Sequence, residues 1–250
     1  MKFRYLSTLI MLLHVCLAQA ETSNPLLVIN NTNAPPFTTS TQNGFLDIVV
    51  TEALRRVGAR LELIKQPAER ALLNADSGRI DGDLTRIKGL ETLYPNLIRV
   101  PEKLVDWEFV AFARNPQASA EWPYIRKQQT GHITGWKIYE KAMHGADSVI
   151  SATTPEQLFY LLEKDRIDIA LHARWMGHGY IQQLGLQGIV ELSPPLAKKE
   201  MFIYLNKRHA ALADEIAKAL RELKREGFYQ KHWEEIIGPY RRQGRDLEQS

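Results

Sequence analysis

Short apolar runs and segments of helical periodicity alternate along the first third of the chain. Three runs, at 25–32, 59–67 and 79–84, are apolar and bounded by polar residues, which is typical of buried β-strands. Between them, apolar residues recur at helical spacing over 44–57 and 68–76, and a glycine follows each segment closely. The order strand, helix, strand, helix, strand predicts a parallel sheet with helices on its faces.

The same order begins again after residue 130. Short strands are expected at 131–135, 148–152 and 166–171, with a helix ending at Lys141 between the first two. A second helix is expected over 154–164, where a threonine precedes a proline at its start. The chain therefore contains a second α/β unit of the same kind.

The tripeptide Arg-Ile-Asp opens the third strand of both units, at 79–81 and at 166–168. Taken alone, a helix, a turn and this tripeptide make a generic α/β junction. Because the phrase stands at matched places in two matched runs, it indicates two similar lobes.

Extended runs at 104–114 and 200–208 lie at the boundaries between the two units, so they would form the two crossings of a hinge. The segment 210–238 is helical in pattern, with a break at Gly227, and is expected to pack back on the first lobe. We therefore assign 24–107 and 202–250 to lobe 1 and 108–201 to lobe 2, with hinge segments near 107–114 and 198–206.

The N-terminus has the pattern of a secretory signal peptide over residues 1–20. A short basic start is followed by an apolar run and by Ala18-Gln19-Ala20, so cleavage is expected after Ala20. The apolar run is about a dozen residues long, whereas a membrane span needs roughly 20. Val15 before Cys16 argues against a lipoprotein signal. An exported protein is therefore expected.

Composition excludes several classes of function. The chain is 44% hydrophobic and 24% charged, as in an ordinary globular protein, and its net charge of +3 gives no reason to expect a nucleic-acid partner. Its single cysteine lies in the signal segment, so no disulfide is expected after cleavage. His172 and His178 are six residues apart with no further ligand nearby, so neither a metal nor another cofactor is expected.

The chain resembles the bacterial extracellular solute-binding proteins of family 3, which include periplasmic receptors for polar amino acids. The resemblance runs from about residue 25 to 240, and these stretches carry it: Pro35-Pro36-Phe37, Gly44-Phe45, 78–82 with Arg86, 166–168, and the C-terminal "AKALRELKREGFYQKHWEEIIG". It implies an α/β, two-lobed periplasmic-binding-protein fold of type II. Each lobe would be a mostly parallel sheet flanked by helices, with the ligand in the cleft between lobes.

Candidate ligand-binding residues follow the two copies of the repeated phrase, because ligands of open α/β sheets sit beyond the carboxyl ends of the strands. Asp83, Thr85 and Arg86 follow the first copy, and His172 and Arg174 follow the second. An arginine fork suits a carboxylate, since it makes two parallel charge-assisted bonds.

The resemblance adds roles for some residues. An arginine after the lobe-1 strand holds the ligand's α-carboxylate in amino-acid receptors of the family, and Arg86 is the nearest match. A surface salt bridge is the alternative for Arg86. Arg70 could lean into the same cleft, and Phe37 and Trp136 could line it with aromatic faces. Trp136 could equally be a hydrophobic plug between helix and strand.

One departure from the family changes the expected ligand. Amino-acid receptors usually carry an aspartate at the end of the second-lobe strand, and that place falls on Ala173. The stretch 172–185 contains no carboxylate. Asp83 could receive an ammonium group instead, but an organic acid would suit two arginines and a histidine equally well.

The resemblance and these residues together predict a monomeric periplasmic receptor, not an enzyme. It would bind an amino acid or organic acid and pass it to the permease of an ABC-type uptake transporter. One alternative is a ligand-sensing partner of a membrane signalling protein. Another is a lyase of the cyclohexadienyl dehydratase type, which the missing carboxylate disfavours.

Overall fold

The apolar runs of the first third form the strands of lobe 1 in the computed structural model, which describes residues 24–240. The central strand β1 pairs in parallel with β2 on one side and with β3 on the other. The Asp47 carboxylate accepts hydrogen bonds from the Gly44 and Thr39 amides at the start of α1, both at 2.9 Å. The elements are β1 (Leu26–Asn30), α1 (Phe45–Arg56), β2 (Arg60–Ile64), α2 (Ala68–Asp76), β3 (Gly82–Arg86), η1 (Leu90–Thr92) and β4 (Leu97–Arg99).

Lobe 2 repeats the arrangement. Its central strand β6 pairs in parallel with β7 and with β8, as β1 does with β2 and β3. Helix α5 begins where Thr154 accepts a hydrogen bond from the Gln157 amide and Pro155 takes the first helical position. The elements are α3 (Trp122–Ile125), β6 (Gln129–Ile133), α4 (Lys137–Ala142), β7 (Ser148–Ala152), α5 (Pro155–Glu163), β8 (Ile169–Ala173) and α6 (Arg174–Gln183).

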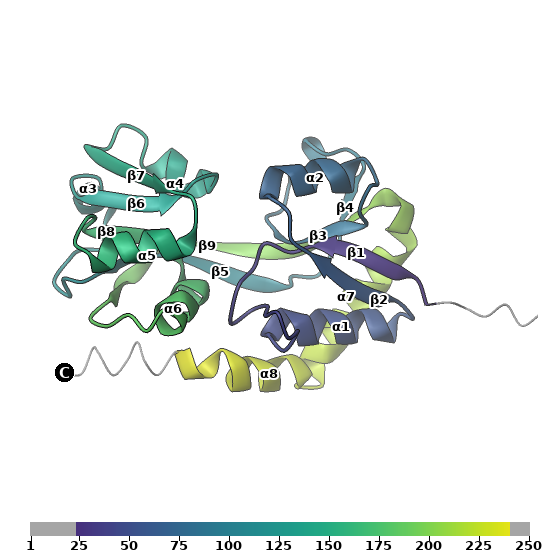
Figure 1. The fold of residues 1–250 in the computed structure, drawn as a ribbon. Helices are drawn as coiled ribbons and strands as arrows, with labels where there is room; N and C mark the ends of the chain where they lie inside the picture. Colours follow the sequence, from purple (N-terminus) through teal and green to yellow (C-terminus); the bar gives the residue numbers. More distant parts are fainter. Residues whose placement is uncertain (1–23, 241–250) are drawn as a thin grey trace, which may run out of the picture.

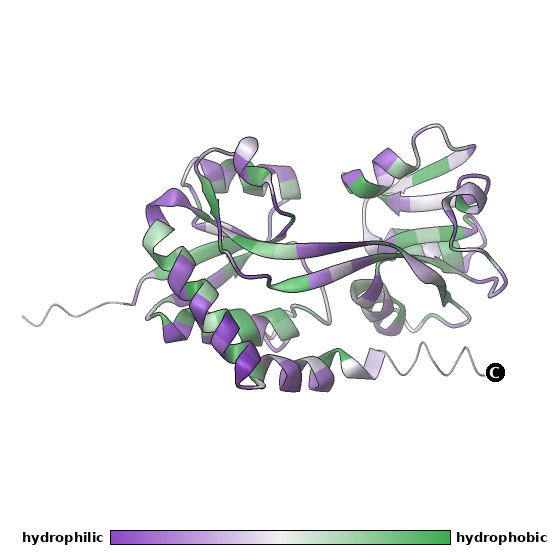
Figure 2. Cartoon of the chain, turned by 180° about the vertical axis from the view of Figure 1, so that it is seen from behind, coloured by the Kyte–Doolittle hydropathy of each residue, from purple (hydrophilic) through white to green (hydrophobic). Residues whose placement is uncertain are grey.

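Two long antiparallel strands, β5 (Val105–Ala113) and β9 (Val190–Asn206), cross between the lobes (Figure 1). Strand β9 also pairs with β3 and β4 in lobe 1, and β5 pairs with β8 in lobe 2, so one mixed sheet runs through both lobes. Both crossings become hydrophilic where they pass between the lobes (Figure 2). The predicted fold class is confirmed.

The C-terminal segment returns to lobe 1 through η2 (Lys207–His209), α7 (Ala210–Arg225) and α8 (Phe228–Ile236). Gly227 separates the two helices with a φ of 79°, a left-handed conformation that glycine adopts without a Cβ clash. Both helices pack against α1. Several elements differ from the sequence prediction. Strand β9 begins at Val190, before the predicted residue 200, and η1, β4, α3 and α6 were not predicted. Strands β3 and β8 begin at Gly82 and Ile169, directly after the Arg-Ile-Asp phrase that was expected to open them.

The repeated Arg-Ile-Asp phrase has a structural role that is the same in both lobes. The Asp81 amide donates to the Val28 carbonyl oxygen at 2.8 Å, and the Asp81 carboxylate accepts from the Val28 amide at 2.7 Å. Asp168 makes the same two bonds with Gln129, at 2.7 and 2.9 Å. Each aspartate therefore fixes the residues just before the third strand against its lobe's central strand, at the middle of β1 in lobe 1 and at the first residue of β6 in lobe 2.

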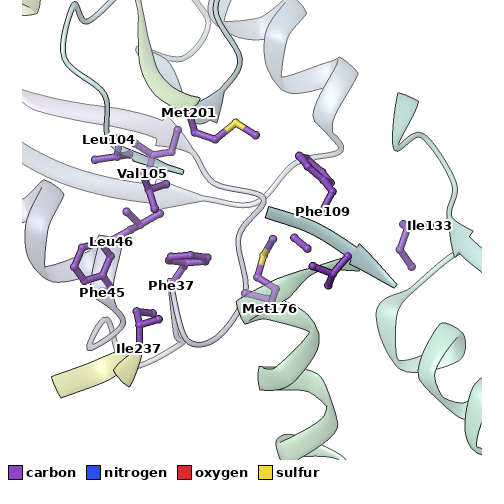
Figure 3. Close-up of a cluster of buried hydrophobic side chains, with 14 of the residues drawn as sticks. Phe37, Phe45, Leu46, Leu104, Val105, Phe109, Ile133, Met176, Met201 and Ile237 are labelled. Carbon is purple, nitrogen blue, oxygen red and sulfur yellow. The ribbon is translucent and has the colours of Figure 1, made fainter. Parts of the chain in front are cut away.

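The lobes also touch away from the crossings, through α6. Phe37 of lobe 1 and Met176 of α6 lie in one buried cluster (Figure 3). A Cβ at Gly179 on α6 would overlap the Pro35 carbonyl group of lobe 1. The rings of Trp175 and Trp233 meet edge to face, 6.4 Å apart. Helix α6 is thus a third connection between the lobes.

Candidate functional site

The carboxyl ends of the parallel strands of each lobe point toward the other lobe (Figure 1). In lobe 1 these are the ends of β1 and β3, with the first turn of α2 beside them. In lobe 2 they are the ends of β6 and β8, which lead into α4 and α6. We call these segments the facing ends. Ligands of open α/β sheets bind at such places.

A buried polar network follows β1 in lobe 1. The Asn31 side chain donates to the Thr38 hydroxyl at 2.8 Å and accepts from Asn33, while the Asn33 amide group donates to the Thr85 hydroxyl at 3.0 Å. Thr85 has a φ of 54°, which is unusual for a β-branched residue. Residues held in such strained conformations concentrate at functional sites in proteins. The network holds the end of β3 in this strained conformation.

Asp83 lies beneath Arg86 at the end of β3. Its carboxylate is fully buried, forms an ion pair with the Arg86 guanidinium at 2.7 Å, and lies 3.4 Å from the Asn30 amide nitrogen. Burial raises the pKa of Asp83 to about 6, against the opposing effects of Arg86 and Asn30. Arg86 is therefore the cation with which this buried carboxylate is paired.

Arg86 keeps free hydrogen-bond donors. Its Nη2 atom carries the bonds to Asp83 and to the Ala68 carbonyl oxygen, whereas Nε is buried without a partner among the described residues. Arg70, one turn into α2, is exposed. Both arginines were predicted as ligand residues, and both lie at the facing end of lobe 1.

The first turn of α4 carries a charged pair opposite α2. Lys137 binds Glu140 at 2.9 Å, and Glu140 also accepts from the Gly135 amide at 2.7 Å. The hydrogen bond to Glu140 is the main cause that raises the pKa of Lys137, and Glu69 on α2 contributes attraction from the other lobe. Glu69 and Lys137 thus place opposite charges on the two facing ends.

Trp136 is held between other aromatic rings. It lies nearly parallel to Tyr139 at 5.9 Å and to Trp107 of β5 at 6.2 Å. The alternative of a hydrophobic plug between helix and strand describes this packing better than an open aromatic wall. Trp107, which the sequence analysis missed, lies on the crossing itself and is half-buried.

His172 lies in the interior of lobe 2 rather than at its surface. Burial lowers its pKa to about 4, so the ring is neutral near pH 7, and Nδ1 lies 3.2 Å from the Ala173 carbonyl oxygen. The Trp136 ring lies against it, 4.7 Å between centroids. This differs from the predicted ligand role, because an interior position faces no solute.

Arg174 is occupied by two carboxylates. Its guanidinium binds Glu108 of β5 and, at 2.8 Å, Glu191 of β9, and His178 contacts Glu191 from the next turn of α6. Burial opposes ionisation of Glu191, but the bonds from His178 and Arg174 outweigh it and lower the pKa of this carboxyl. Arg174 thus anchors α6 to both crossings, which corrects its predicted role as a free cation for a ligand.

Phe37 is 1% exposed and packs against Phe45 and Trp233, with ring centroids 6.4 and 6.3 Å away. The prediction that it lines the space between lobes is corrected: the loop after β1 turns this ring into the core. Asn31 and Asn33 instead carry the polar groups of that loop. Their only signal in the sequence is a cluster of amides directly after a strand.

Within residues 24–240, no group of three or more His, Cys, Asp or Glu side chains is placed to hold a metal ion. No helix of that part of the chain is long and apolar enough to cross a bilayer. The predicted signal peptide lies outside the described residues.

Comparisons with known proteins agree with this geometry. An ancestral arginine-binding protein bound to arginine matches with a TM-score of 0.72 at 18% identity, over 86% of this chain and 99% of its own. This is the two-lobed fold of the periplasmic binding proteins. A substrate-binding protein of an ABC uptake transporter from Streptococcus pneumoniae, with bound histidine, gives a TM-score of 0.71 at 15% identity, over 87% and 94% of the two chains.

A further solved structure with this fold is a histidine kinase sensor domain, with a TM-score of 0.71 and 19% identity over 86% of this chain and 96% of its own. In sequence, an uncharacterized protein of Shewanella oneidensis is 29% identical over 203 residues, 74% of this chain and 73% of that protein. No family model matches the chain.

Proposed function

We propose that this protein is a periplasmic receptor that closes around a small polar solute, an amino acid or a related carboxylate, and passes it to an uptake transporter. The observation that carries the proposal is the pair of facing ends, each with polar or charged groups, on lobes joined by two crossings and by α6. A solute that contacts both ends stabilises the arrangement in which the lobes are close.

Several findings support this function. Solved proteins of the same fold include receptors with bound arginine or histidine. Thr85, with its unusual φ, and Arg86, whose Nη1 has no partner among the described residues, both lie at the facing end of lobe 1. Binding and release complete the cycle, so the proposal needs no catalytic step, cofactor or metal.

Thermal unfolding tests the proposal. The protein is purified, unfolded and refolded to remove carried-over ligand, and then melted with amino acids, organic acids, amines and small sugars. A ligand at a hundred times its Kd adds about 2.7 kcal/mol to the free energy of unfolding. For a domain of this size the melting temperature rises by about 5–10 °C. If no solute in a broad panel raises it, the receptor function is wrong.

A second candidate is a soluble sensor that presents its ligand to a membrane signalling protein. The match to a histidine kinase sensor domain over 86% of this chain favours it as the alternative. Crosslinking in cells separates the two, because a receptor for uptake crosslinks to a permease and a sensory partner to a signalling protein.

A further inference from the structure

We propose that the solute is a small organic acid that carries a carboxylate and no ammonium group. The inference rests on the proposed function, because it names the class of solute for the same site. It follows from the way in which the carboxylates and cations of the facing ends are already paired.

The carboxylates beside the facing ends are committed to protein partners. Asp83 is buried beneath Arg86, and Glu140 is held by Lys137 and the Gly135 amide. Glu108 and Glu191 are bound by Arg174. An ammonium group needs an ionised acceptor when it leaves water, and each of these four carboxylates already accepts from a cation of the protein, with which an ammonium group would compete.

Glu69 is a further carboxylate near these segments. It lies on the exposed first turn of α2 and attracts Lys137 of the opposite lobe. When the lobes approach, Lys137 is therefore a cation that Glu69 can meet. An added ammonium group would have to compete with that lysine.

The free groups on the same surface are donors. Among the described residues Arg86 bonds through Nη2, which leaves Nη1 without a partner, and the Arg70 side chain is exposed in the first turn of α2. Guanidinium groups bind carboxylates through paired charge-assisted hydrogen bonds, and they repel an ammonium group. An acid whose second polar group is a hydroxyl satisfies these donors and brings no second positive charge.

Matched pairs of solutes test the inference by isothermal titration of the refolded protein. Each pair has one carbon skeleton and differs in the 2-substituent: lactate and alanine, malate and aspartate, 3-phenyllactate and phenylalanine. In the pair that binds most tightly, we expect the hydroxy acid to bind at least 10-fold more tightly than the amino acid, because a charge without a partner is strongly rejected. Equal affinity, or tighter binding of the amino acid, overturns the inference and leaves the receptor function standing.

If no member of any pair binds, the inference is also overturned, and the broad melting panel then decides the receptor function separately. The variant Arg70→Gln should weaken the bound hydroxy acid about fivefold or more without changing the melting temperature. Arg79→Gln is its control, because Arg79 is an exposed arginine of the same lobe at the opposite, amino end of β3. Equal losses of affinity in both variants would show only the general electrostatic effect of removing a positive charge, and would contradict a contact between Arg70 and the solute.

Discussion

The contact between α6 and lobe 1 can be tested at a single atom. A Cβ at Gly179 would overlap the Pro35 carbonyl group, which is backbone and cannot turn aside. Overpacking of this kind costs about 1–3 kcal/mol, and separation of the lobes relieves it. We therefore expect Gly179→Ala to shift the population toward separated lobes by about 5- to 150-fold.

Gly177→Ala is the matched control on the same helix. Its Cβ would meet the Phe112 ring inside lobe 2, so it strains that lobe without touching lobe 1. Both variants gain the same helix propensity, about 1 kcal/mol. The difference between them therefore isolates the contact between lobes.

Pulsed electron paramagnetic resonance measures the effect, with spin labels on cysteines at Gln182 of α6 and Lys231 of α8. Cys16, the chain's single cysteine, is replaced by serine in this background. Gly179→Ala should lengthen and broaden the label distance, and Gly177→Ala should leave it unchanged. If both variants give the distribution of the parent protein, α6 is not a connection between the lobes.

Three further predictions follow from pairs of charged groups. Asp81→Asn should cost about 1.5–3 kcal/mol in a urea titration, because it removes the charge-assisted bonds that this carboxylate accepts from the Val28 amide and from the half-exposed Arg208. Asp168→Asn, which is exposed, should cost about 1 kcal/mol; equal costs would contradict the role assigned to the repeated aspartates. The pKa of Asp83 is raised from 3.8 to about 6 in the folded state, so between these pH values the folded state binds more protons than the unfolded state. The free energy of unfolding should therefore fall as pH rises from about 4 to about 6. Asp83→Asn should flatten this fall, and an unchanged slope in the variant would refute the assignment. Lys137→Glu should weaken solute binding a few-fold, because it replaces the attraction between Lys137 and Glu69 of the other lobe by repulsion. Adding Glu69→Lys should restore the affinity. If the double variant binds no better than Lys137→Glu alone, the attraction between these two residues plays no part in binding.

Periodicity predicted most of the fold because the strands and helices of both lobes are amphipathic or buried in a regular way. The pairing of β1 with β2 and β3, and of β6 with β7 and β8, agrees with the two repeated runs. Helix α6 was missed because it contains two glycines, at 177 and 179, which lower helix propensity. Those glycines are needed for close packing against Phe112 and Pro35.

The site was harder to predict than the fold, because residue type does not reveal what a side chain is paired with. Arg174 looks like a free cation in the sequence, and its partners Glu108 and Glu191 lie on distant crossings. His172 has the residue type of a polar contact, but both faces of β8 are covered, so its side chain lies inside lobe 2. The position of Arg86 could be predicted because it ends a strand whose direction the βα order determines, whereas its contact with a solute stays a prediction.

The most direct test of the account is the distance between the lobes with and without solute. Spin labels at Leu73 on α2 and Lys141 on α4 lie on opposite lobes, both at exposed positions. With a saturating amount of the solute that most raises the melting temperature, the account predicts a shorter and narrower distance distribution than in the refolded, ligand-free protein. An unchanged distribution at saturation would contradict closure of the two lobes around the solute.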